Sequence, residues 1–459
     1  MELFDYQKKA VDFIKEKSKV YLALDMGMGK TLTSLASQVG RNIILVAEKN
    51  EIVNNQNFKK EIDTYFPSMR YFNLREETPE GDIDFVAGIN PDGLDKLPES
   101  VIERTQALII DEATLAKTTS TARFKRVQKI AKTVDHLVLL SGTPMMNGAS
   151  ELYAPLILMD NPLVAGKGAK GRKAFEAVFA GGHYRQVRNT GKWFQDYVWW
   201  NKGANYVREL RFLLQDNFFI LSKAETDVFK KKTRTMVKVE MTIEWLAEYT
   251  QAWNTYLIDA KKRKVDLDNV TELRSLIENG QCYQINSRWK AKRVAKDIAD
   301  GVYGSKRIVV FSMFIETDIL LQEELKKLGV SFRPFEEQQE WKAGDEQVLV
   351  GRIKAHAKGG NLPQASVCLF VDMDFVPSNN IQAENRIDRP EQKEDMLIVY
   401  YMTAGDDVVD AHVRKINQDK ARKIEAFMKP LTQEEIDDMP NRFRIMRSKH
   451  AKDMAVLGI

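Results

Sequence analysis

Short apolar runs recur through the first 160 residues, and helical patterns separate them. The runs cover residues 20–24, 43–47, 107–110 and 137–140. Runs of four or five apolar residues without polar alternation predict strands that are buried on both faces, as in a parallel sheet. Residues 3–16 have the spacing of an amphipathic helix, whose inner face would consist of Phe4, Ala10, Val11 and Ile14. This alternation predicts an α/β domain with a doubly wound parallel sheet over residues 1–160.

The pattern changes over residues 161–300, where strand signals are scarce. Residues 165–173 read AGKGAKGRK and predict a loop rich in Gly and Lys. Residues 231–241 alternate like a strand and predict a connector, whereas residues 242–300 are mostly helical in pattern. We therefore expect an α-rich insertion over residues 161–300.

Strand signals return after residue 301. Apolar runs rich in β-branched residues stand at 307–312, 347–350, 367–371 and 396–401. Residues 315–328 predict a helix between the first two of these strands. The last residues are charged and helical in pattern, with interruptions at Pro430 and Pro440. These patterns predict a second α/β domain over residues 301–415 and a helical tail over residues 416–459.

The composition excludes several classes of protein. Apolar residues make up 44% of the chain and charged residues 29%, which is typical of a folded globular protein and not of a disordered one. No apolar run is long enough to span a membrane, and the first residues lack the layout of a secretion signal. The two cysteines, Cys282 and Cys368, predict neither a disulfide framework nor a zinc cluster, which favours a reducing intracellular location.

Positive charge is concentrated in the middle of the chain. Residues 161–300 carry a net charge of +10, which leaves −6 for the rest of a chain whose total is +4. Such asymmetry indicates a polyanionic partner, although basic residues that only solvate helix surfaces would give the same count. Salt-sensitive contacts with such a partner are expected from Lys167, Lys170, Arg172 and Lys173. Two alternatives stay open for the tryptophans of this region, Trp193, Trp199 and Trp200. They could stack on exposed bases, or they could belong to the core of this lobe.

The segment 26–31, MGMGKT, carries the clearest chemical signal. It follows the predicted strand at residues 20–24, and a helix is expected to begin at Lys30. This arrangement points backbone N–H groups at a phosphate. We expect Gly27 and Gly29 to shape the loop, Lys30 to reach the β- and γ-phosphates of a nucleotide, and the Thr31 hydroxyl to hold Mg²⁺. The strict pattern has glycine where this chain has Leu24, so an ordinary strand-to-helix turn is the alternative.

Two carboxylates, Asp111 and Glu112, directly follow the predicted strand at residues 107–110. They would lie at the edge where parallel sheets bind nucleotides. We expect Asp111 to hold Mg²⁺ and Glu112 to orient or deprotonate the attacking water. A helix cap is the alternative for such a pair taken alone, but the preceding MGMGKT segment favours a nucleotide site.

Several segments between residues 4 and 425 resemble, in the same order, motifs of the Swi/Snf-type branch of superfamily-two helicases. MGMGKT is similar to MGLGKT of that branch, and DEAT at residues 111–114 resembles the DEAD/DEAH box. LSGTP at residues 140–144 resembles the third motif. QAENRIDRPEQ at residues 382–392 resembles the sixth motif, QAxxRxxRxGQ. The size and divergence of the chain suggest a compact viral or bacterial member, acting in the cytoplasm of a bacterium or of a phage-infected host.

This resemblance implies two RecA-like domains that hydrolyse ATP with Mg²⁺. Gln7 would contact adenine, because Tyr6–Gln7 resembles the pair that does so in the family. Catalytic residues of the second domain would be Gln382, Arg386 and Arg389, the two arginines neutralising charge on the transferring phosphoryl group. The third motif would couple the nucleotide to DNA through Ser141, Gly142 and Thr143. The family's DNA contacts correspond to loops at Ser312, Gly359 and Asn361.

The expected function is that of an ATP-dependent DNA translocase or helicase that acts on forked or branched DNA. Branch migration or fork remodelling in replication, recombination or repair is favoured, with DNA as the partner and a monomer as the active form. Replication or recombination proteins are further possible partners, and no membrane is expected. One alternative is an RNA-dependent ATPase, which the form of the sixth motif disfavours. The other is a noncatalytic DNA-binding scaffold with a relic nucleotide fold, but a relic should have lost Lys30, Glu112 or Arg389.

Overall fold

The computed structural model divides the chain into two compact units. Unit 1 consists of Met1–Thr226 and Arg422–Ile459, and unit 2 consists of Asp227–Ala421. The predicted insertion over residues 161–300 is therefore shared between the units, and most of the predicted tail belongs to unit 1. The structure describes residues 2–49, 51–52, 57–81, 84–113, 118–145, 148–186, 197–200, 203–262, 281–357, 360–405 and 409–459.

Unit 1 is built on a parallel sheet of seven strands in the order β3-β4-β2-β5-β6-β1-β9. These strands are β1 (Lys19–Leu24), β2 (Ile43–Val46), β3 (Arg70–Asn73), β4 (Phe85–Ile89), β5 (Ala107–Ile110), β6 (His136–Leu140) and β9 (Phe218–Leu221). The four predicted runs form β1, β2, β5 and β6, which are neighbours inside the sheet. The sequence did not predict β3, β4 or β9. β3 and β9 are edge strands of four residues, and β3 carries polar residues at both ends.

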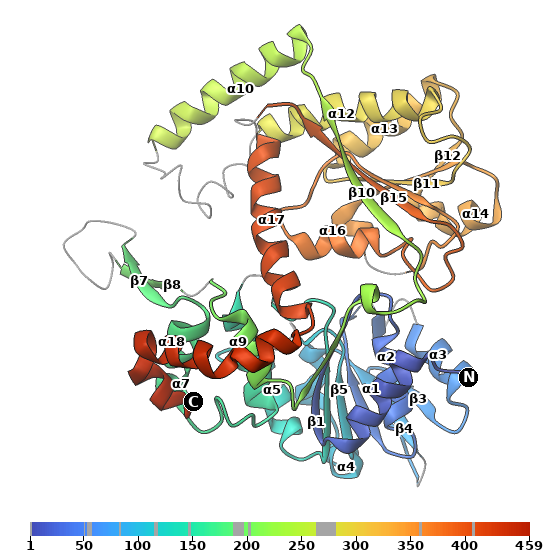
Figure 1. Cartoon of the computed structure of the whole chain (residues 1–459). Helices are drawn as coiled ribbons and strands as arrows, with labels where there is room; N and C mark the ends of the chain where they lie inside the picture. Colours follow the sequence, from blue (N-terminus) through green and yellow to red (C-terminus); the bar gives the residue numbers. More distant parts are fainter. Residues whose placement is uncertain are drawn as a thin grey trace. The chain divides into compact units, whose positions relative to one another are not determined.

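Unit 1 also contains helices, some of which pack on this sheet and others on neighbouring helices. They are α1 (Asp5–Glu16), α2 (Lys30–Ser37), α3 (Asn57–Tyr65), α4 (Glu99–Arg104), α5 (Ala122–Ala131), α6 (Tyr153–Leu158), α7 (Gly168–Phe179), α9 (Val207–Leu213) and α18 (Gln433–Leu457). Helices α1 and α2 lie side by side against β1 (Figure 1). The predicted inner positions Ala10, Val11 and Ile14 are buried. Phe4 is instead 42% exposed, because it precedes the helix and stacks on Tyr6.

Two local predictions in unit 1 were wrong. The segment 165–173 is not a loop throughout, because α7 begins at Gly168 and buries Ala174 and Phe175 in the core. Pro440 does not interrupt the tail helix but lies within the first turns of α18, where the helix loses one hydrogen bond without ending. Helix α18 packs against α7 and α9 (Figure 1). A separate antiparallel hairpin, β7 (His183–Gln186) and β8 (Tyr197–Trp200), follows α7.

Unit 2 is built on a parallel sheet of six strands in the order β10-β15-β14-β11-β13-β12. These strands are β10 (Lys232–Val239), β11 (Ile308–Ser312), β12 (Phe332–Pro334), β13 (Val348–Arg352), β14 (Val367–Phe370) and β15 (Met396–Thr403). The four predicted runs form β11, β13, β14 and β15, and the predicted connector at residues 231–241 is the edge strand β10. The fold class predicted from the sequence, two doubly wound parallel sheets with a helical C-terminal part, is thus confirmed.

The helices of unit 2 are α10 (Ile243–Lys262), α12 (Gln281–Ala299), α13 (Ile315–Lys327), α14 (Gln338–Ala343), α15 (Ile353–His356) and α16 (Pro377–Glu384). Helix α17 (Val409–Met428) begins in unit 2, and its residues from Arg422 onward belong to unit 1. Within the described part of the chain, no helix has the length and apolar character needed to cross a membrane.

Candidate nucleotide and DNA site

The loop between β1 and α2 has the backbone that the MGMGKT segment predicts. Gly27 and Gly29 adopt left-handed φ values of +85° and +73°, which residues with a Cβ atom rarely adopt. A Cβ atom on Gly29 would also approach the Gln7 Nε2 atom to 2.6 Å. Gln7 Nε2 donates a hydrogen bond of 3.2 Å to the carbonyl of Met28. Gln7 therefore holds the loop from α1, and a bare backbone at Gly29 leaves room for this contact.

Lys30 and Thr31 open helix α2 at the end of this loop. Lys30 Nζ donates hydrogen bonds of 3.1 and 3.4 Å to the carbonyls of Leu24 and Asp25. The first carbonyl belongs to the last residue of β1 and the second to the residue that follows it, so the ammonium group stays within the loop that would surround a phosphate. The residue that departs from the strict glycine pattern, Leu24, thus takes part through its backbone.

Asp111 lies at the end of β5, and its backbone N–H donates to the carbonyl of Val46 at 2.8 Å. The pKa of its carboxyl is raised to about 7, first by burial and then by the charge of Glu112, and the charge of Lys30 opposes both. Asp111 and Lys30 are therefore electrostatic neighbours, as a shared nucleotide site requires. Glu112 has a left-handed φ of +59°, and such strain at a non-glycine residue clusters at functional sites.

The described residues fit a magnesium ion. Mg²⁺ prefers hard oxygen ligands and binds through one or two carboxylates together with substrate phosphates. The Thr31 hydroxyl and the Asp111 carboxylate supply such oxygens, and a cation would favour the ionised form of a carboxyl whose pKa is raised.

The third-motif segment packs on the phosphate loop from the end of β6. A Cβ atom on Gly142 would come within 2.8 Å of Met26 Cγ and within 3.3 Å of Lys30 Nζ. The backbone N–H of Thr143 donates to Ser141 Oγ at 3.1 Å, and both side chains are buried. A change in the position of Lys30 would thus directly alter its contact with Gly142, as the predicted coupling role of Gly142 requires.

The sixth motif of unit 2 places its two arginines differently. Arg386 is only 1% exposed, and its guanidinium donates to the backbone carbonyls of His356, at 2.9 Å from Nε, and of Gly360. Arg389 is half-buried, and its Nε has no hydrogen-bond partner among the described residues. Burial lowers the pKa of Arg389, although Glu391 and Asp388 oppose this. The Gln382 Oε1 atom is likewise buried without a described partner.

Residues 6–296, more than half of the chain, match the model of the SNF2-related domain. The chain belongs to the SNF2-related family. It is 24% identical over 453 residues to the SWI/SNF-related matrix-associated actin-dependent regulator of chromatin subfamily A-like protein 1 homolog of Caenorhabditis elegans, covering 89% of this chain and 60% of the relative. It is 23% identical to chromodomain-helicase-DNA-binding protein 1-like of Mus musculus, covering 87% of this chain and 47% of the relative. The chain thus spans 60% or less of the length of these two relatives.

Among solved structures, the SNF2-related chain is similar to the Sulfolobus solfataricus SWI2/SNF2 ATPase core in complex with dsDNA. The identity is 18%, the TM-score is 0.42, and the match covers 97% of this chain and 96% of the archaeal one. Membership of the SNF2-related family implies the use of ATP, which agrees with the geometry around Lys30 and Asp111.

The residues predicted to contact DNA have mixed surroundings in the SNF2-related chain. Ser312 is fully buried, so only the loop that follows it is accessible, whereas Asn361 is exposed. Gly359 lies outside the described residues. Lys170 is exposed on α7, but Lys167 Nζ donates to the carbonyls of Leu163 and Leu457.

The other two predicted cations of this segment also have partners inside unit 1. Arg172 forms an ion pair of 2.9 Å with the buried Glu176, and Lys173 donates to Tyr184 OH at 3.3 Å. Glu176 also accepts the indole N–H of Trp199 at 2.6 Å. Trp199 is therefore bound to Glu176 of α7. Trp193 lies outside the described residues. Helix formation explains the ion pair between Arg172 and Glu176, because residues that are four apart in the sequence lie on the same face of a helix.

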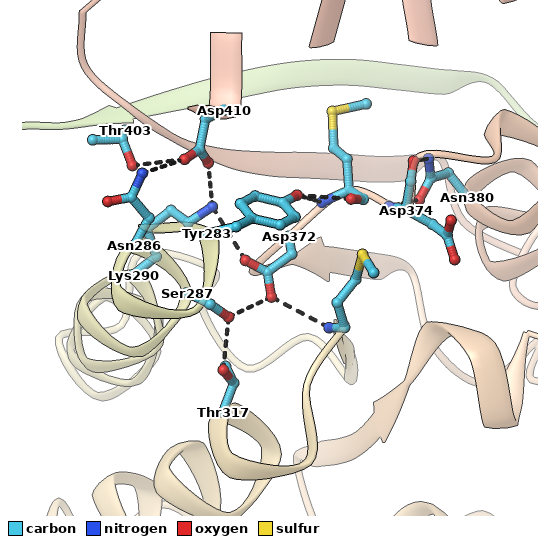
Figure 2. A network of polar contacts seen from close by, with 12 residues as sticks. Tyr283, Asn286, Ser287, Lys290, Thr317, Asp372, Asp374, Asn380, Thr403 and Asp410 are labelled. Atoms are coloured by element: carbon cyan, nitrogen blue, oxygen red, sulfur yellow. Dashed lines mark hydrogen bonds and ion pairs between the residues drawn. The ribbon is translucent and has the colours of Figure 1, made fainter. Parts of the chain in front are cut away.

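A buried polar network in unit 2, which sequence reasoning missed, holds the loop after β11 (Figure 2). Asp372 accepts hydrogen bonds from Ser287 Oγ at 2.5 Å and from the backbone N–H of Met313 at 3.2 Å. Lys290 Nζ lies 3.3 Å from Asp372 and forms a second ion pair with Asp410. Burial would lower the pKa of Lys290, but these two carboxylates raise it above its ordinary value. The network therefore fixes the loop next to Ser312 from helices α12 and α17.

Only one member of this network had a signal in the sequence. Asp372 directly follows the apolar run at residues 367–371, whereas Lys290 is one cation among several in a region whose pattern is mostly helical. Burial of a lysine at 0% exposure depends on the acidic partners that the fold brings to it, and these stand 82 and 120 residues away.

Proposed function

We propose that this chain is an ATP-driven DNA translocase that acts on forked or branched DNA, by branch migration or fork remodelling in replication, recombination or repair. The observation that supports the proposal most is the left-handed glycine loop that holds Lys30 beside Asp111, in a chain of the SNF2-related family. Such a loop, with a lysine at the helix start and carboxylates that follow another strand of the same parallel sheet, suits a nucleoside triphosphate.

In this proposal, unit 1 binds the nucleotide and activates the water. Lys30 binds the β- and γ-phosphates, and Glu112 orients the attacking water and accepts its proton. Mg²⁺, held by Thr31 and Asp111, would neutralise charge on the phosphate oxygens. Gln7 keeps the loop in place through the Met28 carbonyl and contacts the adenine.

Unit 2 contributes the arginine finger, for which we propose Arg389 in place of Arg386. The donors of Arg386 already bind backbone carbonyls in the interior of unit 2. Arg389 Nε has no described partner, so its guanidinium is better suited to bind a phosphoryl group. Lys30 and Arg389 belong to different units, so turnover would depend on both, and cycles of hydrolysis would move the units along a DNA backbone.

Support for DNA as the track comes from charge and from exposed residues. The excess of +10 over residues 161–300 suits a polyanion. Lys170 and Asn361 are exposed, and Lys290 and Asp372 fix the loop at Ser312. Such contacts would give register on the backbone and little sequence specificity.

ATP turnover on matched nucleic acids tests the proposal. The substrates are linear duplex, forked, three-way and four-way DNA, together with single-stranded DNA and RNA. We expect duplex and branched DNA to stimulate turnover, and Lys30→Ala to abolish it while Lys59→Ala, an exposed control in the same unit, does not. Stimulation by RNA alone, or equal turnover of Lys30→Ala and the unchanged chain, would contradict the proposal.

A further inference from the structure

Two acidic side chains of the sixth motif, Glu384 and Asp388, are buried at 1% and 2% exposure. They stand on either side of Arg386, and Asp388 directly precedes Arg389. Buried carboxylates are costly unless cations and hydrogen bonds compensate them. The groups that compensate them therefore decide where the chain around Arg389 lies.

The cations that bind both carboxylates come from the edge strand β10. Arg234 forms a bidentate contact with Glu384, with 2.8 Å from Nε to Oε1 and 2.6 Å from the terminal nitrogen to Oε2. Lys232 Nζ lies 2.7 Å from Asp388 and 3.4 Å from Glu384. Tyr400 OH donates to Glu384 at 2.7 Å. Burial would raise the pKa of Glu384, but Lys232 and Arg234 outweigh it, so that the pKa lies below its ordinary value.

The spacing of the two cations follows from strand geometry. Lys232 and Arg234 stand two residues apart, so they point to the same face of β10. Among the described strands, β10 pairs only with β15, and it is the first of them after the chain leaves unit 1 at Thr226. Arg234 thus ties the end of α16 to the segment by which the chain enters unit 2, and Lys232 ties both this helix end and Asp388, just before Arg389, to the same segment.

We propose that Lys232 and Arg234 are positioning residues that hold the sixth motif so that Arg389 presents its guanidinium to the nucleotide. This inference rests on the proposed function, because it takes Arg389 as the finger. A bidentate pair fixes a carboxylate in direction as well as in distance. A finger displaced by about 1 Å loses on the order of 100-fold in rate, so such a clamp would control turnover without touching the nucleotide.

The variants Lys232→Met and Arg234→Gln test the proposal, with Lys238→Met as the matched control. Lys238 lies on the same strand, is exposed and has no described acidic partner, so it removes the same charge without the contact. DNA-stimulated kcat should fall about 10- to 100-fold in the two test variants and stay unchanged in the control. The dissociation constant for ATP should stay unchanged in all three, because Lys30 and its loop belong to unit 1.

A double-mutant cycle with Arg389→Ala separates positioning from general stabilisation. If the clamp acts through Arg389, Arg234→Gln has no further effect on kcat once Arg389 is removed. Arg234→Lys keeps the charge but not the bidentate contact, so it should fold and restore only part of kcat. The inference would be overturned if Arg234→Gln lowered kcat by the same factor with and without Arg389, or if Lys238→Met lowered kcat as much as the test variants do.

The outcomes also separate this inference from the proposed function. If Arg389→Ala turns over ATP as fast as the unchanged chain, the proposed function of the sixth motif fails. If Arg389→Ala loses turnover while Lys232→Met and Arg234→Gln keep it, only the inference about β10 fails.

Discussion

Arg386 and Arg389 are three residues apart in the sequence, but their guanidinium groups have different surroundings. Arg386 is enclosed by the carbonyls of His356 and Gly360 and lies over the ring of Phe335 at 5.1 Å. Arg389 has no such enclosure at Nε among the described residues. The sequence pattern predicts the same role for both arginines, whereas we propose from these contacts that Arg386 contributes to stability and Arg389 to the chemistry.

Replacing each arginine by alanine should therefore affect different properties, turnover in one variant and stability in the other. Arg389→Ala should lower kcat about 10³-fold or more, with little change in the free energy of unfolding. Arg386→Ala leaves buried carbonyls without donors, which should lower the free energy of unfolding by about 1–3 kcal/mol. Turnover assays and urea denaturation of both variants check this. An Arg386→Ala protein with unchanged stability and lost turnover would restore the finger role to Arg386.

Glu112 offers a second test at the scale of one residue. Glu112→Gln keeps the shape of the side chain but removes the base, so we expect hydrolysis to fall about 10²- to 10⁴-fold. ATP and DNA binding should be retained, because Lys30 and Gln7 are unchanged. Equilibrium binding of a fluorescent ATP analogue and single-turnover hydrolysis measure the two effects separately. Lost binding with intact hydrolysis would refute the role of Glu112.

The loop between β1 and α2 contains one glycine, Gly29, that combines backbone strain with a close side-chain contact. Gly29 combines a left-handed φ with close contact to Gln7, whereas Gly40 has a left-handed φ of +82° and no atom within 4 Å of the place that a Cβ atom would take. Both Gly29→Ala and Gly40→Ala should lose about 1 kcal/mol of stability through backbone strain. Only Gly29→Ala should weaken ATP binding, measured by titration. Equal weakening in both would show that the Gln7 contact is irrelevant.

Within unit 1, Arg208 of α9 connects helix α9 to the start of helix α18. Arg208 Nε donates to Glu435 at 2.8 Å, and its terminal nitrogens donate to the carbonyls of Ala426, Lys429 and Pro430. The Arg208 hydrogen bond lowers the pKa of Glu435 from 4.5 to about 2. This carboxylate therefore stabilises the folded state fully above pH 4.5, and the contribution is lost as the pH falls towards 2.

Glu435→Gln should accordingly lower the denaturant concentration at the midpoint of unfolding at pH 7. The difference in this midpoint between the variant and the unchanged chain should become smaller below pH 4.5. Glu434→Gln, an exposed neighbour in the same turn, is the control. Chemical denaturation at several pH values between about 7 and 3 makes the comparison. A difference that stays constant across this range would exclude the Arg208–Glu435 contact as its source.

At the scale of elements, the sequence predicts most of the strands that are buried on both faces and the exposed edge strand β10, but it misses the buried strand β4 and the short edge strands β3 and β9. β1, β5, β11 and β14 read as apolar runs because neighbouring strands and helices cover them completely. β3 and β9 are short edge strands whose pairing is decided by tertiary contacts. Helix α7 was missed because its glycines and lysines are typical of loops, although its other face is apolar.

At the scale of the whole molecule, the sequence locates the chemistry better than it locates the supporting contacts. Lys30, Asp111 and Gly142 were predicted from local motifs, and the fold brings them together. The clamp of Lys232 and Arg234 and the buried Lys290 had no local signal, because their partners lie more than 80 residues away in the chain. Such contacts depend on the fold and not on spacing along the sequence.

We propose that hydrolysis of one nucleotide depends on residues of both units, Lys30 of unit 1 and Arg389 of unit 2. The most direct test is duplex-stimulated ATP turnover by Lys30→Ala, by Arg389→Ala and by their equimolar mixture. We predict that each variant loses about 10³-fold or more in kcat, and that the mixture does not recover because one chain must supply both residues. Full turnover by Arg389→Ala would contradict the claim.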